Sequence, residues 1–559
     1  MLPQRCEPDS LPLAKRTGMK NIVWFALVSC LLPAACVQHP SAPGEKGVLS
    51  RDTTITPGLA FNDRFLDSLS VEKFITSEKL DTDMARPIRN FYNGRNYQFA
   101  WFGEKGLDEP GMTLLALLKG FMQLSRDSAL FDAALLDQTR AFADGDVVIP
   151  KNPDTLSRIE LGLTRQFLIY AKTAYAGKLD PEDLQWYIPR KKVDPHSMLD
   201  SLLATKDGNI AGWEPLNPYY RSLRMALLRY DSLALRGGWP TLTIASQRSY
   251  KPGDTGISIA AIKQRLFLSG DLLRPDSSIL YDTVLSGVVR KLRNSFGLSA
   301  GAKIDAALAE ELNVSPQQRI QQLLINLERM RWLPAKTDRQ IIVANIPEYK
   351  LHVFDQGKSV LDMRIVVGQA GHHTVVFSNR LKYIVFSPYW NVPPSIVRNE
   401  ILPNMKRQPH YLDRNRMEIT GYSGGLPVIR QKPGEKNSLG LVKFLFPNEY
   451  NIYFHDTPAK SLFNRDERAF SHGCIRLAEP SKLAALLLKD RPEWTSSSIS
   501  RAMHKGKEQW VTLSRPLPVY IVYVTAWVDK EGLLNFRKDI YGHDAEMATR
   551  LFIQSNVRP

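Results

Sequence analysis

The stretch SHGCIRL, residues 471–477, decides how the C-terminal half of this chain is interpreted. Its cysteine, Cys474, is the only one beyond residue 36. A histidine, His455, lies upstream in the run IYFHDTP at 452–458. A thiol becomes a strong nucleophile when a nearby imidazole takes or holds its proton. We therefore expect Cys474 to attack a carbonyl carbon, with His455 as its general base or ion-pair partner.

The residues around Cys474 predict how the negative charge formed in that attack is held. Gly473 permits a sharp bend, and the backbone amides of Gly473 and Cys474 are expected to point at one oxygen. His472 is two positions from Cys474, and we expect it to shape the site rather than act as the base. The competing interpretations are that Cys474 is an inert buried thiol and that His455 is a structural histidine of the core.

The N-terminus predicts export. Met19 begins a short positive region, an apolar run follows at 22–32, and small residues precede Cys36. This run is typical of a signal peptide and too short for a permanent membrane span. We expect a signal at 1–36, with translation starting at Met1 or Met19. Cys36 resembles the lipidated residue of a bacterial lipoprotein; simple cleavage to a soluble periplasmic product is the alternative. A lone thiol surviving export indicates function, because oxidising compartments pair or damage free thiols.

The composition of the chain limits the classes of molecule that it is expected to bind. The 559 residues carry a formal net charge of +16 and are 43% hydrophobic. A basic surface suits an anionic partner such as cell-wall polymer or acidic lipid. We expect no nucleic acid, because the basic residues are scattered and no nucleic-acid motif is present. We also expect no metal and no cofactor, because the pair His372 and His373 has no Cys or carboxylate partner at ligand spacing.

The spacing of apolar residues and the positions of turn-forming Gly and Pro residues divide the rest of the chain into domains. The expected fold class is multidomain α+β. Helical spacing of apolar residues gives way, near residue 339, to short strand patterns with few helices. The expected parts, in chain order, are a flexible tether at 37–57, a helical scaffold at 58–248, a three-helix module at 249–315, a connecting helix at 316–338 and a mainly β domain at 339–545 with a cap inserted at about 404–440.

Strands are expected where apolar residues alternate or run together. Late strands from Val511 to Val528 are expected to break at Pro516 and Pro518. The other expected strands are Ile341–Ala344, Leu351–Phe354, Met363–Gly368 and Tyr383–Phe386.

The whole pattern resembles the L,D-transpeptidases of the YkuD fold, in which a histidine precedes Ser/Thr-His-Gly-Cys. The resemblance extends to WNVP at 390–393 and to the Pro-Gly, Asn-x-Leu-Gly and Lys-Phe motifs within 432–444. SHGCIR at 471–476 is the form of the large periplasmic (YcbB-like) subfamily, which has a helical scaffold and an inserted peptidoglycan-binding module. The segment 249–315 resembles that module in its entry and closing motifs and departs from it in between, so glycan binding and a purely structural role both stay open.

The resemblance implies a two-step acyl transfer. Cys474 attacks the amide between the L-centre of a diamino acid at stem-peptide position 3 and the D-Ala at position 4. D-Ala leaves, a thioester forms, and the side-chain amine of another stem peptide attacks it to give a 3-3 cross-link. The backbone of Asp456 would orient His455, and Tyr453 would help to hold the oxyanion.

The resemblance also implies a set of substrate-binding residues. Ser471 and His472 belong to it, and Trp390 and Asn391 would wall the donor groove. Arg476 would either hold a substrate carboxylate or brace the loop, and of the two we expect bracing.

Other functions remain open on the sequence. An L,D-carboxypeptidase or an enzyme attaching lipoproteins to the wall differs from the cross-linking enzyme only in its acceptor. A wall-binding scaffold with a silent catalytic domain is the alternative of another class, and the intact pair His455 and Cys474 argues against it. The expected partners are tetrapeptide stems, other wall-synthesis enzymes and, if Cys36 is lipidated, a membrane. The expected location is the periplasm or cell envelope.

Overall fold

The computed structural model describes residues 47–56, 62–127, 129–189, 194–204, 217–244, 249–334 and 340–552. The predicted signal, Cys36 and most of the predicted tether lie outside these residues. No helix among the described residues is both long and apolar enough to cross a membrane. From Leu49 onward the chain forms one compact unit.

The N-terminal part is helical, as the periodicity predicts, and is built around the long helix α5 (Pro153–Ala176). Asn152 caps its start by accepting a hydrogen bond from the Asp154 amide, and Gly177, with φ of 93°, follows its end. Glycine takes that conformation without a Cβ clash. The elements of this part are α1 (Ser68–Ser77), α2 (Thr82–Gly94), β1 (Phe102–Gly103), β2 (Gly106–Leu107), α3 (Glu109–Ser125), α4 (Ala133–Ala143), η1 (Glu182–Leu184), α6 (Pro195–Ala204) and α7 (Pro218–Leu235), of which α7 packs against α11 (Pro316–Trp332).

A small helical module follows, with a hydrophobic core of its own that includes Ile262, Leu285 and Leu308. Its helices are α8 (Ile257–Leu268), α9 (Thr283–Ser295) and α10 (Ala306–Asn313). The predicted connecting helix is present as α11 (Pro316–Trp332). Ser315 and Gln318 form a capping box at its start, which satisfies free amides of the first turn.

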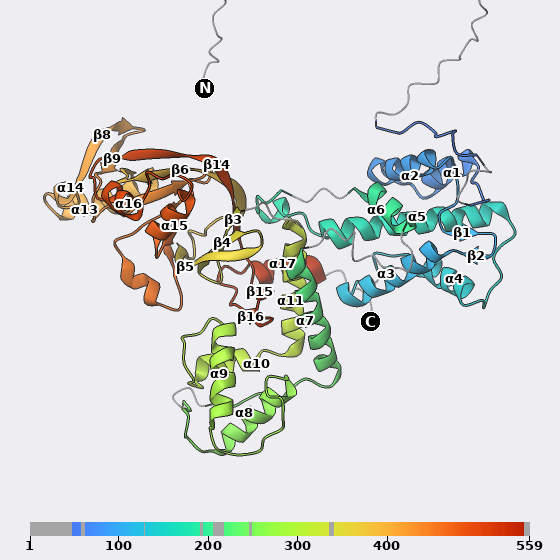
Figure 1. Cartoon of the computed structure of the whole chain (residues 1–559), viewed down its shortest axis with the longest axis horizontal. Coiled ribbons are helices and arrows are strands. Elements are labelled where there is room, and N and C mark those ends of the chain that lie inside the picture. Colours follow the sequence, from blue (N-terminus) through green and yellow to red (C-terminus); the bar gives the residue numbers. More distant parts are fainter. Residues whose placement is uncertain are drawn as a thin grey trace, which may run out of the picture. The chain divides into compact units, whose positions relative to one another are not determined.

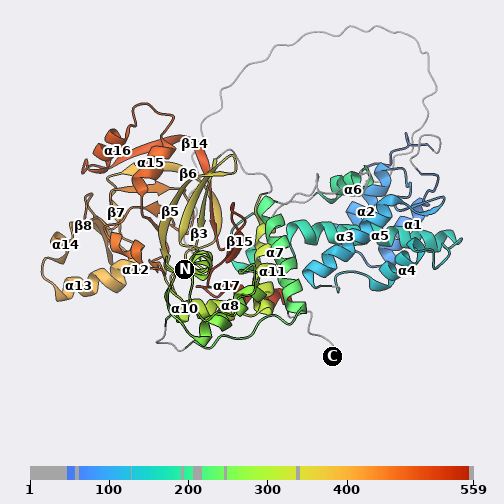
Figure 2. The ribbon, with the colours of Figure 1, turned by 60° about the horizontal axis from the view of Figure 1, so that its bottom comes forward.

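The C-terminal part is a sheet that closes on itself. Its strands run in the order β12, β5, β13, β11, β10, β6, β14, β3, β4, and β4 pairs back with β5. The long strands β6 and β14 lie side by side, and helices α15 (Pro480–Leu487) and α16 (Ser496–Met503) lie next to them (Figures 1 and 2). The strands are β3 (Gln340–Asn345), β4 (Lys350–Asp355), β5 (Lys358–Gly368), β6 (Phe377–Phe386), β10 (Val442–Leu445), β11 (Phe454–His455), β12 (Ala469–Ser471), β13 (Ile475–Leu477) and β14 (Gln509–Val522).

The predicted break at Pro516 and Pro518 is wrong. Strand β14 runs through both prolines, and its register against β6 shifts between Thr512 and Leu517. The shift spans Pro516, where a bulge tolerates a residue that lacks an amide hydrogen, whereas Pro518 lies in register with Arg380. The chain then continues through β15 (Ala526–Val528) and β16 (Leu534–Phe536) to α17 (His543–Phe552).

A cap with its own small core interrupts the domain. That core includes Val392, Val397 and Ile401, so the cap begins before the predicted position 404. Its elements gather at one end of the sheet in both views (Figures 1 and 2). They are β7 (Trp390–Asn391), α12 (Pro394–Ile396), the π-helix η2 (Val397–Ile401), α13 (Leu402–Arg407), α14 (Tyr411–Arg414), β8 (Met417–Ser423) and β9 (Leu426–Gln431).

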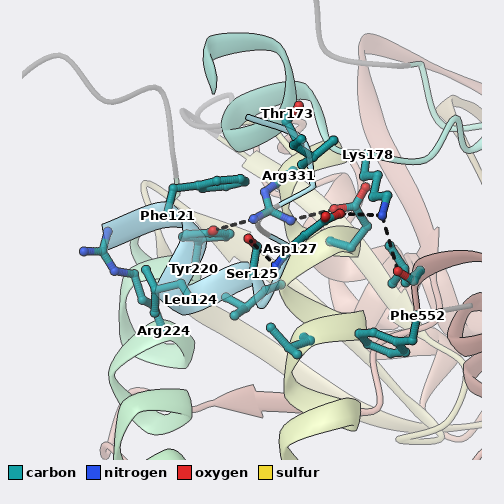
Figure 3. Close-up of a pocket in the computed structure, with 15 residues that line it drawn as sticks. Phe121, Leu124, Ser125, Asp127, Thr173, Lys178, Tyr220, Arg224, Arg331 and Phe552 are labelled. Carbon is teal, nitrogen blue, oxygen red and sulfur yellow. Dashed lines mark hydrogen bonds and ion pairs between the residues drawn. The ribbon is translucent and has the colours of Figure 1, made fainter. Parts of the chain in front are cut away.

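A small pocket lies among the helices and is lined in part by an ionic network (Figure 3). Arg331 donates to Glu328 and to the Tyr220 hydroxyl, and Lys178 donates to Asp127. The cavity holds about 60 Å³. Small-molecule sites usually measure about 300 Å³ or more, so this cavity is a poor candidate for a substrate site.

Candidate active site

Two neighbouring parallel strands bring the predicted nucleophile and base together. Strand β11 ends at His455, and β13 begins directly after Cys474. His455 is in register with Arg476, and the Ile475 amide donates to the Tyr453 carbonyl over 3.2 Å. Residues in register on parallel strands face the same side, and every second residue shares that side.

Direct interactions support this shared face. The Tyr453 and His455 ring centroids are 5.8 Å apart, and the Tyr453 hydroxyl and the Cys474 thiol each shift the pKa of the other. The charge of Arg476 acts on both Cys474 and His455. Phe454 and Ile475, on the opposite face, are fully buried in the main core. The core therefore anchors both strands while four polar side chains share one face.

The His455 imidazole is buried and fixed by the residue that follows it. Its Nδ1 is 2.5 Å from the Asp456 carbonyl oxygen, so Nδ1 carries the proton and donates it to that oxygen. The Nε2 atom is then left as the acceptor, which is the state a general base needs. This hydrogen bond joins His455 to the backbone of Asp456, whose orienting role stays a prediction.

Asp456 is itself held on three sides. Its amide donates to the Val442 carbonyl, and its carboxylate accepts hydrogen bonds from the Leu441 amide at 2.9 Å and from Lys460 at 2.5 Å. A Cβ at Gly440 would come within 2.4 Å of this carboxylate, so the glycine permits the close approach. These contacts keep the Asp456 carbonyl aimed at His455.

Burial determines the protonation of both reactive groups. It lowers the pKa of His455 to about 4, and the positive charge of Arg476 acts in the same direction. It raises the pKa of the Cys474 thiol to about 11, against hydrogen bonds from Tyr453 and the charge of Arg476. Both groups are therefore neutral at pH 7 in the resting site. Of the two roles left open for His455, this favours the general base over a resting ion pair.

The resting thiol does not point at the imidazole. Cys474 Sγ donates to the Asn451 carbonyl oxygen at 3.4 Å, on the side away from His455 along the strand. Cys474 has no disulfide partner and is partly exposed. A rotation about its Cα–Cβ bond is the motion that would turn the sulfur toward His455.

The glycine before the nucleophile is used differently from the prediction. Gly473 has φ of 109°, so its conformation suits glycine. Its amide donates to Ser471 Oγ at 3.2 Å, and Ser471 Oγ donates to the Cys474 carbonyl at 2.5 Å. The Gly473 amide is therefore occupied within the loop, and the expectation that it points with the Cys474 amide at one oxygen is not met. In the described part of the chain, the Cys474 amide has no hydrogen-bond partner.

His472 connects this loop to the cap. Its Nε2 is 3.0 Å from a carboxylate oxygen of Glu400 in η2, and its ring centroid is 5.1 Å from that of His372. The side chain is exposed and makes no contact with Cys474 that would suit a base. These contacts agree with a shaping role for His472.

Arg476 lies between the two strands with its guanidinium uncommitted. Among the described residues it makes no hydrogen bond or ion pair, and its buried Nε lacks a partner. A bracing arginine would be bonded to the protein, so the geometry favours the alternative that Arg476 meets an anionic part of the substrate.

Trp390 and Asn391 lie in the cap rather than on the strands of the site. Both pair with β9, and Trp390 packs against the cap core. No interaction of either residue with Tyr453, His455 or Cys474 is found in the described part of the chain.

Two residues at the site have no signal in the sequence. Thr374 donates to the Gly473 carbonyl at 2.8 Å, and Tyr541 donates to the Gly368 carbonyl at 2.5 Å. Both come from loops far from the cysteine motif in sequence, and no spacing rule marks them. Only the fold brings them to the catalytic loop.

Comparison with known proteins finds matches to both the sheet domain and the helical part. Residues 339–496 match the family model described as the L,D-transpeptidase catalytic domain, YkuD, and residues 86–227 match the Scaffold domain. A Haemophilus influenzae protein named "Putative L,D-transpeptidase" is 33% identical over 243 residues, which cover 41% of this chain and 49% of that protein. The chain thus spans about half the length of this curated relative.

Solved structures with similarity to the chain include two transpeptidases. An L,D-transpeptidase from Mycobacterium smegmatis has 14% identity and a TM-score of 0.19, over 33% of this chain and 58% of that one. An L,D-transpeptidase (Yku) from Stackebrandtia nassauensis has 13% identity and a TM-score of 0.20, over 50% of this chain and 97% of that one.

Proposed function

We propose that this chain, whose catalytic domain belongs to the YkuD family of L,D-transpeptidases, cross-links peptidoglycan stem peptides through a thioester on Cys474. The observation that carries the proposal is the arrangement of β11 and β13. It presents a free thiol and an imidazole with a fixed Nδ1 proton on one face of one sheet. Acyl transfer by a cysteine needs these two groups within reach of one carbonyl.

In the first step, the Cys474 sulfur bonds to the carbonyl carbon of the amide between residue 3, at its L-centre, and D-Ala 4. The thiol proton passes to His455 Nε2 as the sulfur attacks, because a neutral imidazole accepts it. The Cys474 amide faces the developing oxyanion, and Tyr453 supplies a second donor. The C–N bond then breaks, His455 returns the proton to the leaving nitrogen, and D-Ala departs.

In the second step, the thioester is the acyl donor. The side-chain amine of a second stem peptide attacks the thioester carbonyl and loses a proton to His455. The carbon–sulfur bond breaks, and the thiolate takes that proton back. The product is a 3-3 cross-link, and the enzyme is restored without metal or cofactor. Water as the acceptor would give an L,D-carboxypeptidase, and an amine of a lipoprotein would give an attachment enzyme.

Arg476 is proposed as a substrate contact, because its guanidinium has no protein partner in the described residues. The stem peptide carries carboxylates that an arginine can bind through two parallel hydrogen bonds. Ser471 and His472 would shape the loop beneath the donor, while Trp390 and Asn391 would meet the substrate only as part of the cap.

The setting of the enzyme is also part of the proposal. A signal at 1–36, with Cys36 lipidated or the chain simply cleaved, would deliver it to the periplasm or cell envelope. The net charge of +16 favours association with anionic wall material. The module containing α8, α9 and α10 would bind glycan or act as a spacer, and other wall-synthesis enzymes would be its partners.

Incubation with purified tetrapeptide muropeptides tests the function. Cross-linked dimers with release of D-Ala would support transpeptidation, and tripeptides alone would indicate a carboxypeptidase. We expect Cys474→Ala to abolish both products and His455→Ala to leave a small residual activity.

A carbapenem adduct on Cys474, detected by mass spectrometry, would support its role as the nucleophile. Wild-type rates in the folded Cys474→Ala protein would refute the proposal, and a folded wild type that forms neither product nor adduct would favour the silent scaffold.

A further inference from the structure

Thr374 joins two glycines across the base of the catalytic loop. Its side chain is 1% exposed. Its Oγ1 accepts a hydrogen bond from the Gly368 amide at 2.9 Å and donates one to the Gly473 carbonyl at 2.8 Å. This buried hydroxyl both accepts and donates a hydrogen bond, so it links the end of β5 to the residue before Cys474.

The Gly473 carbonyl and the Cys474 amide belong to one peptide group. That group is planar and trans, so its C=O and N–H point in opposite directions. Holding the carbonyl oxygen on Thr374 therefore fixes the direction of the Cys474 N–H. This N–H has no partner among the described residues, whereas the Gly473 amide donates to Ser471 Oγ. Gly473, with φ of 109°, gives the backbone more conformational freedom here than another residue would, and the hydrogen bond to Thr374 holds the observed orientation of the peptide.

Thr374 rests on a rigid frame. Its amide donates to Tyr541 Oη at 3.4 Å, and the same hydroxyl donates to the Gly368 carbonyl at 2.5 Å. A Cβ at Gly368 would lie 2.0 Å from the His372 carbonyl oxygen, so the loop closes tightly over this glycine.

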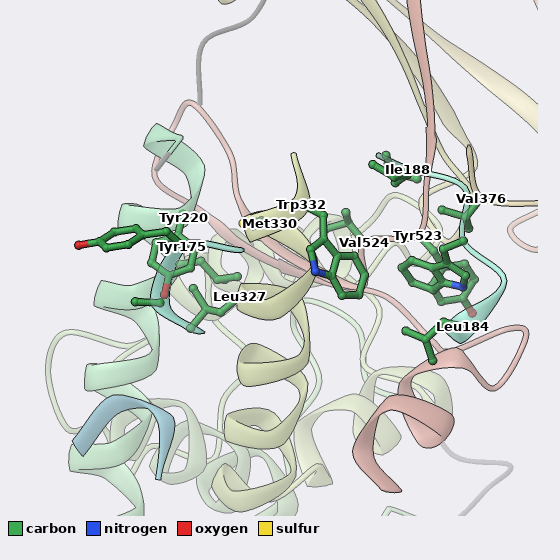
Figure 4. Packing of buried hydrophobic residues seen from close by; sticks show 14 of the residues in the cluster. Tyr175, Leu184, Ile188, Tyr220, Leu327, Met330, Trp332, Val376, Tyr523 and Val524 are labelled. Atoms are coloured by element: carbon green, nitrogen blue, oxygen red, sulfur yellow. The ribbon is translucent and has the colours of Figure 1, made fainter. Parts of the chain in front are cut away.

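The helical part of the chain supports this frame directly. The Tyr187 amide donates to the Val376 carbonyl at 2.9 Å, two residues after Thr374. Figure 4 shows Ile188 and Leu184 beside Val376 and Tyr523. The segment that follows α5 therefore packs against the loop that carries Thr374.

We propose that Thr374 is a positioning residue that holds the Gly473–Cys474 peptide so that the Cys474 N–H binds the oxyanion. The inference rests on the proposed function and names the donor of that site. Thr374 itself does not touch the reacting atoms. Without its hydroxyl, the peptide rotates and the oxyanion loses a donor, which costs about a hundredfold or more in rate.

The test compares Thr374→Val, which keeps the shape and removes the hydroxyl, with Thr374→Ser, which keeps the hydroxyl. Two reactions of Cys474 are timed by mass spectrometry in the full chain. Acylation by a carbapenem passes through an oxyanion, whereas alkylation by iodoacetamide displaces iodide and forms none. We expect Thr374→Val to slow acylation by about a hundredfold with alkylation near wild type, and Thr374→Ser to restore most of the acylation rate.

Equal losses in both reactions would overturn the inference, because they would mean that the thiol itself is displaced. Acylation of Thr374→Val at the wild-type rate would overturn it too. Thermal unfolding of each variant shows whether it is folded, and Thr374→Ala, with the same expected result, replaces Thr374→Val if the latter does not fold. A wild type that is alkylated but never acylated would instead mark the failure of the proposed function and remove the oxyanion that Thr374 is argued to serve.

Discussion

Burial has the largest effect on the pKa of His455 and of Cys474, and the positive charge of Arg476 lowers both pKa values. The base works only as a neutral imidazole, so acylation falls as the pH drops through the pKa of His455, at about 4 in the resting protein. A nearby cation disfavours the protonated ring. Removing it in Arg476→Gln therefore raises the pKa of His455, and the acid limb of the rate profile moves to higher pH. The pKa of the Cys474 thiol rises further, because its thiolate loses a counter-charge.

Carbapenem acylation measured from pH 3.5 to 9 checks this prediction. We expect the acid limb of Arg476→Gln to lie between pH 4 and the ordinary histidine value of about 6.5, with a lower rate at pH 7. Lys358→Gln, which removes an exposed cation elsewhere on the same domain, serves as the control and should leave the limb in place. An unmoved limb in Arg476→Gln would mean that the arginine does not act through its charge.

At the scale of elements, an ionic triad fastens β4 to its neighbours. His352 Nδ1 is 2.6 Å from Asp362, its partner in register on β5, and Nε2 is 3.0 Å from Glu348. Burial alone would lower the pKa of His352, but the two carboxylates outweigh burial and raise it to about 9. Hydrogen bonding to His352 contributes to lowering the pKa of Asp362 and of Glu348 to about 2 each.

The triad predicts how stability depends on pH. Because the pKa of His352 is raised on folding, the protonated ring stabilises the fold fully below about pH 6.5. This stabilisation is lost as the pH rises through about 9. We expect the free energy of unfolding to fall by on the order of 2 kcal/mol over this window. Chemical denaturation at pH 6 and pH 9 measures it. His352→Gln should flatten the slope, whereas His410→Gln, at an exposed pair, should not. The same slope in His352→Gln would refute the assignment.

The elements also show what a sequence can predict. The strand at Leu351–Phe354 is found because its apolar residues alternate, and the strand at Ile341–Ala344 because a short apolar run indicates a buried strand. The predicted break in β14 is wrong at Pro516 because a bulge, which only the pairing with β6 creates, accommodates that proline. The start of the cap was placed too late because Val392 and Val397 resemble ordinary core residues until their partners are known.

The site is predictable to a similar degree. Cys474 and His455 carry chemistry in their side chains, and a motif marks them. The free amide of Cys474 and its support by Thr374 depend on backbone direction, which no residue type encodes. The sequence predicts the Gly473 amide in the oxyanion hole, but in the structure this amide donates to the Ser471 hydroxyl. Such competition among local hydrogen bonds is decided by the folded loop.

At the scale of the whole molecule, one hydrophobic core runs from the helical part into the sheet domain. It contains Phe91 and Leu163 together with Ile384 and Ile475, whereas the module of α8, α9 and α10 and the cap have cores of their own. Helix α11 contributes Ile320, a residue of this shared core. We therefore expect the helical part and the sheet to unfold together.

The ionic network at the end of α11 is the place to test this cooperativity. Arg331 bonds the Ala174 carbonyl, Glu328 and the Tyr220 hydroxyl, all in buried surroundings. Arg331→Met would leave Glu328 buried without its cation, which typically costs about 3–5 kcal/mol. The exposed pair of Arg550 and Glu546 is the matched control, because Arg550→Gln should cost at most about 1 kcal/mol.

Scanning calorimetry and limited proteolysis of both variants measure the outcome. If the core acts as one unit, Arg331→Met lowers the midpoint of a transition that includes the sheet domain, and protease cuts appear in the helical part and in β14 at the same temperature. Carbapenem acylation of Cys474 should then be lost at that midpoint as well, since β11 and β13 are anchored in the same core. A split into two transitions, with the sheet melting at its wild-type temperature, would show that α11 joins two independent domains.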